Sequence, residues 1–304
     1  MATTNPTAIL TLSKYSIKLG TPVTIYTNPT SSETVQDVWY EFGYITETIS
    51  RDAGESCEWT PPIDLAYQLP NAKSGKGTIY CDIWLNNEIV STTTCTFALT
   101  VPQSVAPTID SVSIADTVTL PFDGYVRTKS QLKIDVTATA QYESTIASCQ
   151  STIDGVSYTG LSFTTRTLNK AGELTLTVTV TDARGLTTTA TRTITVLDYS
   201  PPSLTLFTAE RCTDDGSAAQ TDGEKVRFSA AGSIAPVENL NTGTVQLFYR
   251  VSKTESWTTA TLASGSLAIT NYAFSMTNQL LTQVFDAMSR YELKLVITDK
   301  LTTV

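Results

Sequence analysis

Residues 174–196 read LTLTVTVTDARGLTTTATRTITV, and this stretch decides the fold class. Apolar residues and threonines alternate up to Thr181, the letters DARG interrupt the pattern, and the alternation resumes as far as Val196. Alternation with a period of two predicts strands that bury one face, and two such runs around a short break predict a β-hairpin. No residue of the stretch belongs to a catalytic motif.

Related stretches recur at intervals of about 100 residues, the size of one immunoglobulin-like sandwich. Residues 291–304, YELKLVITDKLTTV, repeat the order of strand, Thr-Asp, short turn and Leu-Thr-Thr. Residues 77–101, GTIYCDIWLNNEIVSTTTCTFALTV, have the same plan around Asn86 and Asn87. The repetition predicts an all-β protein of tandem immunoglobulin-like β-sandwich domains arranged as a rod.

Proline-containing linkers divide the repeats. VPQSVAPTI follows the first hairpin and LDYSPPSL follows the second. Proline has no backbone N–H and cannot continue a central strand, so these segments are natural domain ends, and tandem prolines stiffen a junction. The predicted domains are 1–102, 106–198 and 203–304.

Two expectations concern the last domain. NQLLTQVFDAMSR, residues 278–290, has apolar residues at a helical period over barely three turns and is a candidate helix, at even odds with a non-helical segment. The final hairpin reaches only the start of its second strand at Val304. Either this domain closes in an unusual way, or the missing strand lies beyond Val304.

Composition and charge narrow the possible functions. Threonine occupies 56 of 304 positions, only 16% of residues are charged, and the net charge is −9. Such a chain is typical of extracellular or virion proteins, and it lacks the clustered Lys and Arg that nucleic acid or an anionic membrane would require. The N-terminus shows no basic leader and no apolar run long enough to span a bilayer, so we expect synthesis in a cytoplasm and a soluble product.

Catalytic chemistry finds little support in the residues. The chain has no histidine, which removes Ser-His-Asp and Cys-His triads, and it has no phosphate-binding glycine motif. Paired carboxylates stay open, because such a pair need only meet in space. We therefore expect no enzyme, and we assign no catalytic, cofactor-binding or metal residue.

The odd number of cysteines argues against a disulfide framework, so we expect the thiols to be free and buried. Folding about the turn at Asn86 and Asn87 places Cys81 opposite Thr92, which makes a bond between Cys81 and Cys95 doubtful.

The acidic segment around residues 214–224 has two interpretations, a metal site or plain turns. The oxygens that could bind calcium belong to Asp214, Asp215, Asp222 and Glu224. Their spacing does not match an EF-hand loop, and Asp-Gly sequences form turns through side-chain hydrogen bonds, so we favour two turns flanking a solvated loop. The Thr-Asp pairs ending at Asp182 and Asp299 are likewise interpreted as hairpin turns.

Aromatic residues are interpreted mainly as structural. Trp39 lies among Val38, Tyr40 and Phe42 and is expected to anchor the core of the first domain. Trp84, beside the Asn86 turn, is the better candidate for an exposed contact. The remaining candidates, expected in loops with partial burial or at a strand start, are Trp59, Trp257 and Tyr291.

The second linker and the segments after it resemble a known family. Tyr-Ser-Pro-Pro at 199–202 precedes a strand that ends in Arg211 and Cys212, then the acidic turn 214–216, and much later YELKLVITDK. This pattern is similar to minor structural tail proteins of phages that infect Gram-positive bacteria. The resemblance covers roughly 174–303, and residues 1–105 show only a generic immunoglobulin-like pattern.

The resemblance implies a non-enzymatic virion protein of the tail tip, baseplate or a host-facing fibre, made in the host cytoplasm. Its implied partners are other tail proteins, copies of itself around a three- or six-fold axis, and host cell-wall carbohydrate, with no nucleic acid and no membrane. No cofactor is implied. The alternatives are a bacterial surface adhesin built of immunoglobulin-like repeats, and the accessory domains of a carbohydrate-active enzyme whose catalytic domain is not in this sequence.

Overall fold

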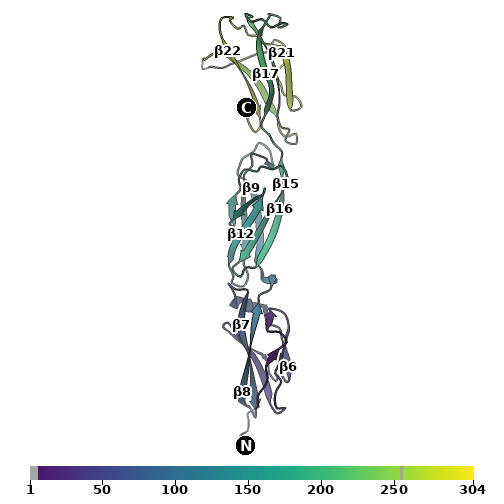
Figure 1. The fold of residues 1–304 in the computed structure, drawn as a ribbon, viewed down its shortest axis with the longest axis vertical. Helices are drawn as coiled ribbons and strands as arrows, with labels where there is room; N and C mark the ends of the chain where they lie inside the picture. The colour runs from purple at the N-terminus through teal and green to yellow at the C-terminus, as the bar shows by residue number, and fades with distance from the viewer. Residues whose placement is uncertain (1–5, 254–255) are drawn as a thin grey trace. The chain divides into compact units, whose positions relative to one another are not determined.

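The computed structural model describes residues 6–253 and 256–304, and this part of the chain is almost entirely β (Figure 1). Its helical content consists of two 3₁₀ segments, η1 (Ile63–Gln68) and η2 (Gln103–Val105). The expectation of no leader falls partly on residues 1–5, which lie outside the described residues. No helix in the described part is long and apolar enough to cross a membrane.

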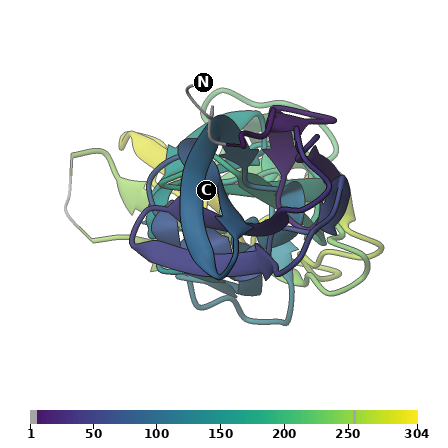
Figure 2. The same cartoon turned by 90° about the horizontal axis from the view of Figure 1, so that it is seen from below.

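Residues 11–100 form two facing sheets. One sheet has the order β1 (Thr11–Leu12), β3 (Val23–Tyr26), β6 (Ser56–Trp59), and the other has the order β2 (Ser16–Lys18), β8 (Glu88–Thr100), β7 (Ser74–Leu85), β4 (Val35–Phe42), β5 (Ile45–Ser50). Figure 2 shows these purple and blue strands surrounding a common interior. Tyr40 and Phe97 contact Trp59 there, with ring centroids 4.8 and 5.3 Å away.

The same strand order recurs in residues 108–197. One sheet has the order β14 (Ser162–Thr164), β11 (Leu132–Thr139), β9 (Thr108–Asp116), and the other β10 (Tyr125–Val126), β16 (Thr187–Leu197), β15 (Gly172–Asp182), β12 (Ile146–Ile153), β13 (Val156–Thr159). In both sets, a short early strand pairs in parallel with the last strand. This is the order of an immunoglobulin-like sandwich, and β15 and β16 confirm the hairpin predicted for 174–196.

Residues 203–299 form two three-stranded sheets. Their orders are β17 (Ser203–Cys212), β18 (Lys225–Ser233), β21 (Ala273–Leu280), and β20 (Thr258–Thr259), β19 (Gly243–Val251), β22 (Tyr291–Asp299). They match the earlier strand order except for two strands: in the described residues, neither the short early strand, the counterpart of β2 and β10, nor a named strand after β22 is present. The immunoglobulin-like, all-β fold class is thereby confirmed.

The candidate helix at 278–290 is wrong. Its first residues belong to β21, which pairs with β18 up to Leu280, and the rest is irregular. Leu281 and Phe285 are fully buried in the core formed with Phe228 and Leu247. The apolar spacing that suggested a helix therefore reflects an irregular segment that buries two side chains.

Contacts divide the chain into two compact units. One contains residues up to Ser113 with 134–163 and 176–192, and the other contains 114–133, 164–175 and 193–304. The domain boundaries proposed from the sequence stay a prediction.

Candidate functional site

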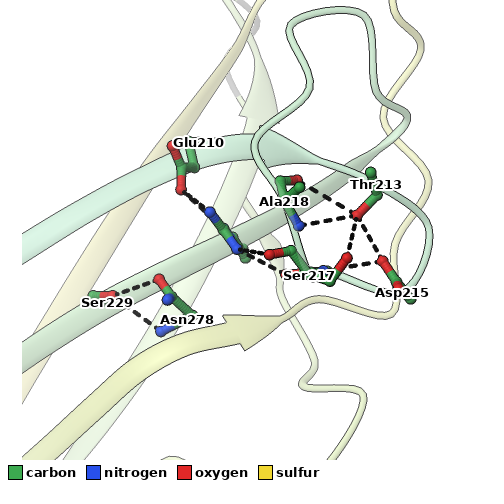
Figure 3. Close-up of polar contacts among 9 residues, drawn as sticks. Glu210, Thr213, Asp215, Ser217, Ala218, Ser229 and Asn278 are labelled. Atoms are coloured by element: carbon green, nitrogen blue, oxygen red, sulfur yellow. Dashed lines mark hydrogen bonds and ion pairs between the residues drawn. The ribbon is translucent and has the colours of Figure 1, made fainter.

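The acidic segment after β17 folds into turns (Figure 3). The carboxylate of Asp215 accepts hydrogen bonds from the Thr213 hydroxyl at 2.6 Å and from the Ser217 backbone N–H at 3.0 Å. Both donors favour the ionised carboxylate, and they lower the pKa of Asp215 to about 2. The turn interpretation of this segment is confirmed.

An arginine ties this turn to the sheet. Arg227 of β18 donates to the backbone oxygens of Gly216 and Ser217, at 2.9 and 3.0 Å, and forms an ion pair with Glu210 of β17. The second turn holds Asp222, which accepts a hydrogen bond from Gln220. Among the described residues, no group of three or more His, Cys, Asp or Glu is placed to hold a metal ion.

Both Thr-Asp pairs end strands at hairpin turns, as predicted, and both aspartates are buried. Asp182 accepts a hydrogen bond from the N–H of Leu186 at 2.8 Å, and Asp299 accepts from the N–H of Leu301 at the same distance. The two turns thus use one device, in which a buried carboxylate receives the backbone donor on the far side of the turn.

Arg184, in the turn between β15 and β16, is a buried arginine with an extensive set of hydrogen bonds. Its side chain and that of Asp182 are both fully buried, and they form an ion pair at 3.3 Å. The guanidinium also donates to four backbone oxygens, at 2.6–3.3 Å, which belong to Ala66, Leu69, Gln141 and Tyr142. All five guanidinium N–H donors therefore have acceptors.

These contacts join segments far apart in the sequence. Ala66 and Leu69 belong to η1 and its C-terminal end, whereas Arg184 lies in the second repeat of the hairpin pattern. Leu186 is buried in the same hydrophobic core as Leu65, and Thr188 donates to the backbone oxygen of Pro107. The turn thus packs directly on the preceding sandwich through a polar centre and an apolar rim. We name this set of contacts the Arg184 joint.

A second joint surrounds the Tyr199 linker. The buried Tyr199 donates from its hydroxyl to Asp299 at 3.3 Å, and Arg127 donates to the Tyr199 backbone oxygen at 2.9 Å. Lys129 donates to the backbone oxygen of Leu301 at 3.0 Å. Burial is the main cause of the raised pKa of Tyr199, so its hydroxyl stays protonated and able to donate.

The edge of β22 is only partly covered. Val304 and Ile297 exchange two backbone hydrogen bonds of 2.8 Å, so the last residues begin an antiparallel pair. When the two repeats are aligned at Asp182 and Asp299, Leu293 and Leu295 of β22 occupy the positions of Leu176 and Val178 in β15. The two β15 side chains are fully buried, whereas the two β22 side chains are half-buried. A hollow of about 420 Å³ lies here, lined by residues that include Leu293, Arg211 and Val226.

The prediction for Trp39 is wrong. Because side chains alternate along β4, the burial of Val38 and Tyr40 places Trp39 on the outer face of the sheet, half-buried. Trp59, expected in a loop, is instead the buried tryptophan of this core. Trp84 is half-buried, and Trp257 contacts two cations, with the Arg250 guanidinium carbon and the Lys294 ammonium nitrogen 4.4 and 4.6 Å from its ring centroid.

The cysteines are free thiols, three of them buried. Cys81 lies opposite Thr93 rather than the predicted Thr92, because the register shifts between Ile83 and Trp84. Burial, reinforced by the Asp82 carboxylate, raises the pKa of Cys81 to about 12. Cys57 and Cys95 are half-buried, so burial of the thiols is only partial at these two positions.

Solved structures resemble the chain in fold alone. Dpr2 Ig1-Ig2 in complex with DIP-Theta Ig1-Ig3 is 11% identical with a TM-score of 0.32, over 99% of this chain and 97% of that chain. Sidekick-1 immunoglobulin domains 1–5 are 14% identical with a TM-score of 0.35, over 99% of this chain and 57% of that chain. Fibronectin(III)-like modules of Clostridium thermocellum CbhA are 16% identical with a TM-score of 0.24, over 62% of this chain and 95% of that chain.

A comparison with curated protein sequences finds no match. A comparison with protein families finds one described as siphovirus protein of unknown function (DUF859), which matches residues 7–304. Since this match spans nearly the whole sequence, the chain belongs to that siphovirus protein family.

Proposed function

We propose that this phage protein is a non-enzymatic structural component of the virion, placed in the tail tip, the baseplate or a host-facing fibre. Its sandwiches act as spacers and as docking surfaces. The observation that supports this most is the Arg184 joint, in which a single buried side chain makes three hydrogen bonds within its own sandwich and two to the preceding one, at Ala66 and Leu69. A buried polar contact that joins successive repeats is suited to holding a distance rather than to turning over a substrate.

The proposed partners are other tail proteins, further copies of this chain around a three- or six-fold axis, and carbohydrate of the host cell wall. A net charge of −9 disfavours nucleic acid and anionic membrane surfaces. Membership of a siphovirus family favours the phage interpretation over a bacterial surface adhesin.

Antibody labelling of purified virions tests the proposal. Antibodies raised against residues 106–304 and carrying gold particles should decorate the distal end of the tail in electron micrographs. Virions of a phage that lacks the gene serve as the control for specificity. Labelling of the capsid, or absence of the protein from purified particles, would contradict the proposed role.

A further inference from the structure

The outer face of the β4–β7 sheet carries an ordered aromatic pair. Trp39 and Tyr80 are cross-strand partners, and their rings are stacked with centroids 3.9 Å apart and planes 3° from parallel. Trp39 faces outward because Val38 and Tyr40 on either side of it face the core. The stack supports the indole from one side and fixes its orientation.

Two carboxylates are held beside this pair. Asp82 accepts hydrogen bonds from the Trp39 indole N–H at 2.8 Å and from the Thr92 hydroxyl at 2.7 Å. Asp37 pairs with Arg51 at 3.2 Å and accepts from the backbone N–H of Asp52 at 3.1 Å. Each carboxylate oxygen thus accepts one hydrogen bond, and its second lone pair can accept another.

Trp39 and the two carboxylates of Asp37 and Asp82 line one hollow of about 320 Å³. Trp84 also lines it, and the indole Nε1 of Trp84 is a buried donor without a hydrogen-bond partner in the described structure. A buried donor left unpaired costs free energy and requires an explanation. An aromatic pair that only stabilises the sheet explains the stack, but it explains neither the hollow nor the unpaired donor.

We propose that this hollow binds a pyranose unit of an uncharged polysaccharide. The indole of Trp39 offers an apolar surface for the C–H face of a sugar ring, and the carboxylates of Asp37 and Asp82 accept hydrogen bonds from sugar hydroxyls. This inference rests on the carbohydrate contact in the proposed function and gives it a location.

Charge decides which sugars fit. The ionisable side chains that line the hollow are Asp37, Glu47, Asp82 and Arg51, three acids and one base, which gives a net formal charge of −2. Sugars that carry carboxylate or phosphate groups would be repelled, whereas neutral sugars would not. The site therefore selects against acidic glycans.

Binding to the full chain can be measured by NMR of the tryptophan indole N–H groups, with calorimetry for affinity. The probes are tetrasaccharides of β1,4-linked glucose, of β1,4-linked N-acetylglucosamine and, as the acidic control, of galacturonate. We expect at least one neutral probe to shift the Trp39 and Trp84 signals, and galacturonate to shift neither. Trp39→Ala should weaken binding at least about tenfold, whereas Trp257→Ala, which removes a tryptophan far along the sequence, should leave it unchanged.

A second variant guards against a folding defect in Trp39→Ala. Thr48→Arg, at an exposed position of β5 that lines the hollow, should block binding while the Trp39 stack remains. The proposal is overturned if no neutral probe shifts either indole signal at millimolar concentration, if galacturonate binds as well as the neutral probes, or if both variants bind normally. Such a failure would leave the virion location, measured independently by labelling, untouched.

Discussion

At the scale of single residues, Arg184 shows why arginine and not lysine occupies the turn after β15. A guanidinium presents five N–H donors in a planar arrangement, and the five acceptors around it include one carboxylate and four backbone oxygens. Lysine has three donors on a compact ammonium and would leave buried acceptors unpaired. Removal of one member of a buried ion pair leaves the other charge uncompensated.

Substitution of Arg184 by alanine should lower the free energy of unfolding by about 3–5 kcal/mol, because Asp182 and four carbonyl groups lose their partner in the interior. Arg184→Lys should lie between the alanine variant and the native protein. Urea unfolding followed by tryptophan fluorescence measures both. Arg192→Ala, at an exposed position of β16, is the matched control, and equal losses in the two alanine variants would contradict the assignment.

The lowered pKa of Asp215 predicts that the stability of the folded protein depends on pH. Its pKa falls from 3.8 to about 2 on folding, so its stabilising contribution is present above pH 3.8 and is lost as the pH falls through about 2. Between those values the native protein should lose stability faster than Asp215→Asn, which does not titrate. Thermal unfolding across this range measures the difference, and parallel curves for the two proteins would show that the turn does not hold the carboxylate.

At the scale of elements, the closing hairpin of the second sandwich, β15 with β16, is complete, whereas the hairpin that begins with β22 is not. β15 has β16 along its edge, and its inward side chains are fully buried. The corresponding edge of β22, opposite β19, pairs in the described residues only with Thr303 and Val304, and burial is complete at Ile297 but not at Leu295 or Leu293. Burial therefore ends where strand pairing ends.

The edge of β22 should accept one more antiparallel strand. Fusing TATRTITV, residues 189–196 of β16, after Val304 should raise the unfolding temperature and protect the Leu293 and Leu295 amides from hydrogen exchange, because paired backbone groups and covered apolar side chains replace a solvated edge. A fusion with aspartate at every second position is the control. Equal protection in both fusions, or in neither, would contradict an acceptor edge.

At the scale of the whole molecule, one sandwich plan is repeated and the repeats are joined by buried side chains rather than by sequence linkers alone. The Arg184 joint uses the turn between β15 and β16, and the Tyr199 joint uses the turn after β22. In each joint, the aspartate that caps the hairpin turn also accepts a hydrogen bond from the central side chain: Asp182 from Arg184, and Asp299 from the Tyr199 hydroxyl. The repeated Thr-Asp motif thus shapes both the turn and the junction.

Deleting the first sandwich should weaken the next one. A chain that begins at residue 104 lacks the Ala66 and Leu69 oxygens and the apolar contact to Leu186, so two hydrogen bonds of Arg184 are exchanged for bonds to water and the Leu186 side chain is exposed. Hydrogen exchange of the β15 amides should be faster in this fragment than in the full chain. Identical exchange rates would show that the two sandwiches are energetically independent.

The candidate surfaces were visible in the sequence only in part. The Thr-Asp turns and the acidic turn at Asp215 follow from local chemistry, since a short polar side chain bonds its own backbone. Arg184 gave no signal, because four of its five acceptors are backbone oxygens, up to 118 residues away, which any sequence could provide. The outward direction of Trp39 was available from the alternation in β4, because Val38, Tyr40 and Phe42 occupy the core-facing positions.

The sequence by itself determined the all-β class, the hairpins and their turns, because period-two alternation, β-branched residues and turn-forming aspartates act over a few residues. Only the tertiary structure decided that residues 278–280 end a strand and 281–290 are irregular, that Trp59 rather than Trp39 fills the core, and that Arg184 joins two sandwiches. These outcomes depend on which distant groups lie within hydrogen-bond or van der Waals distance. That proximity arises only when the sheets pack.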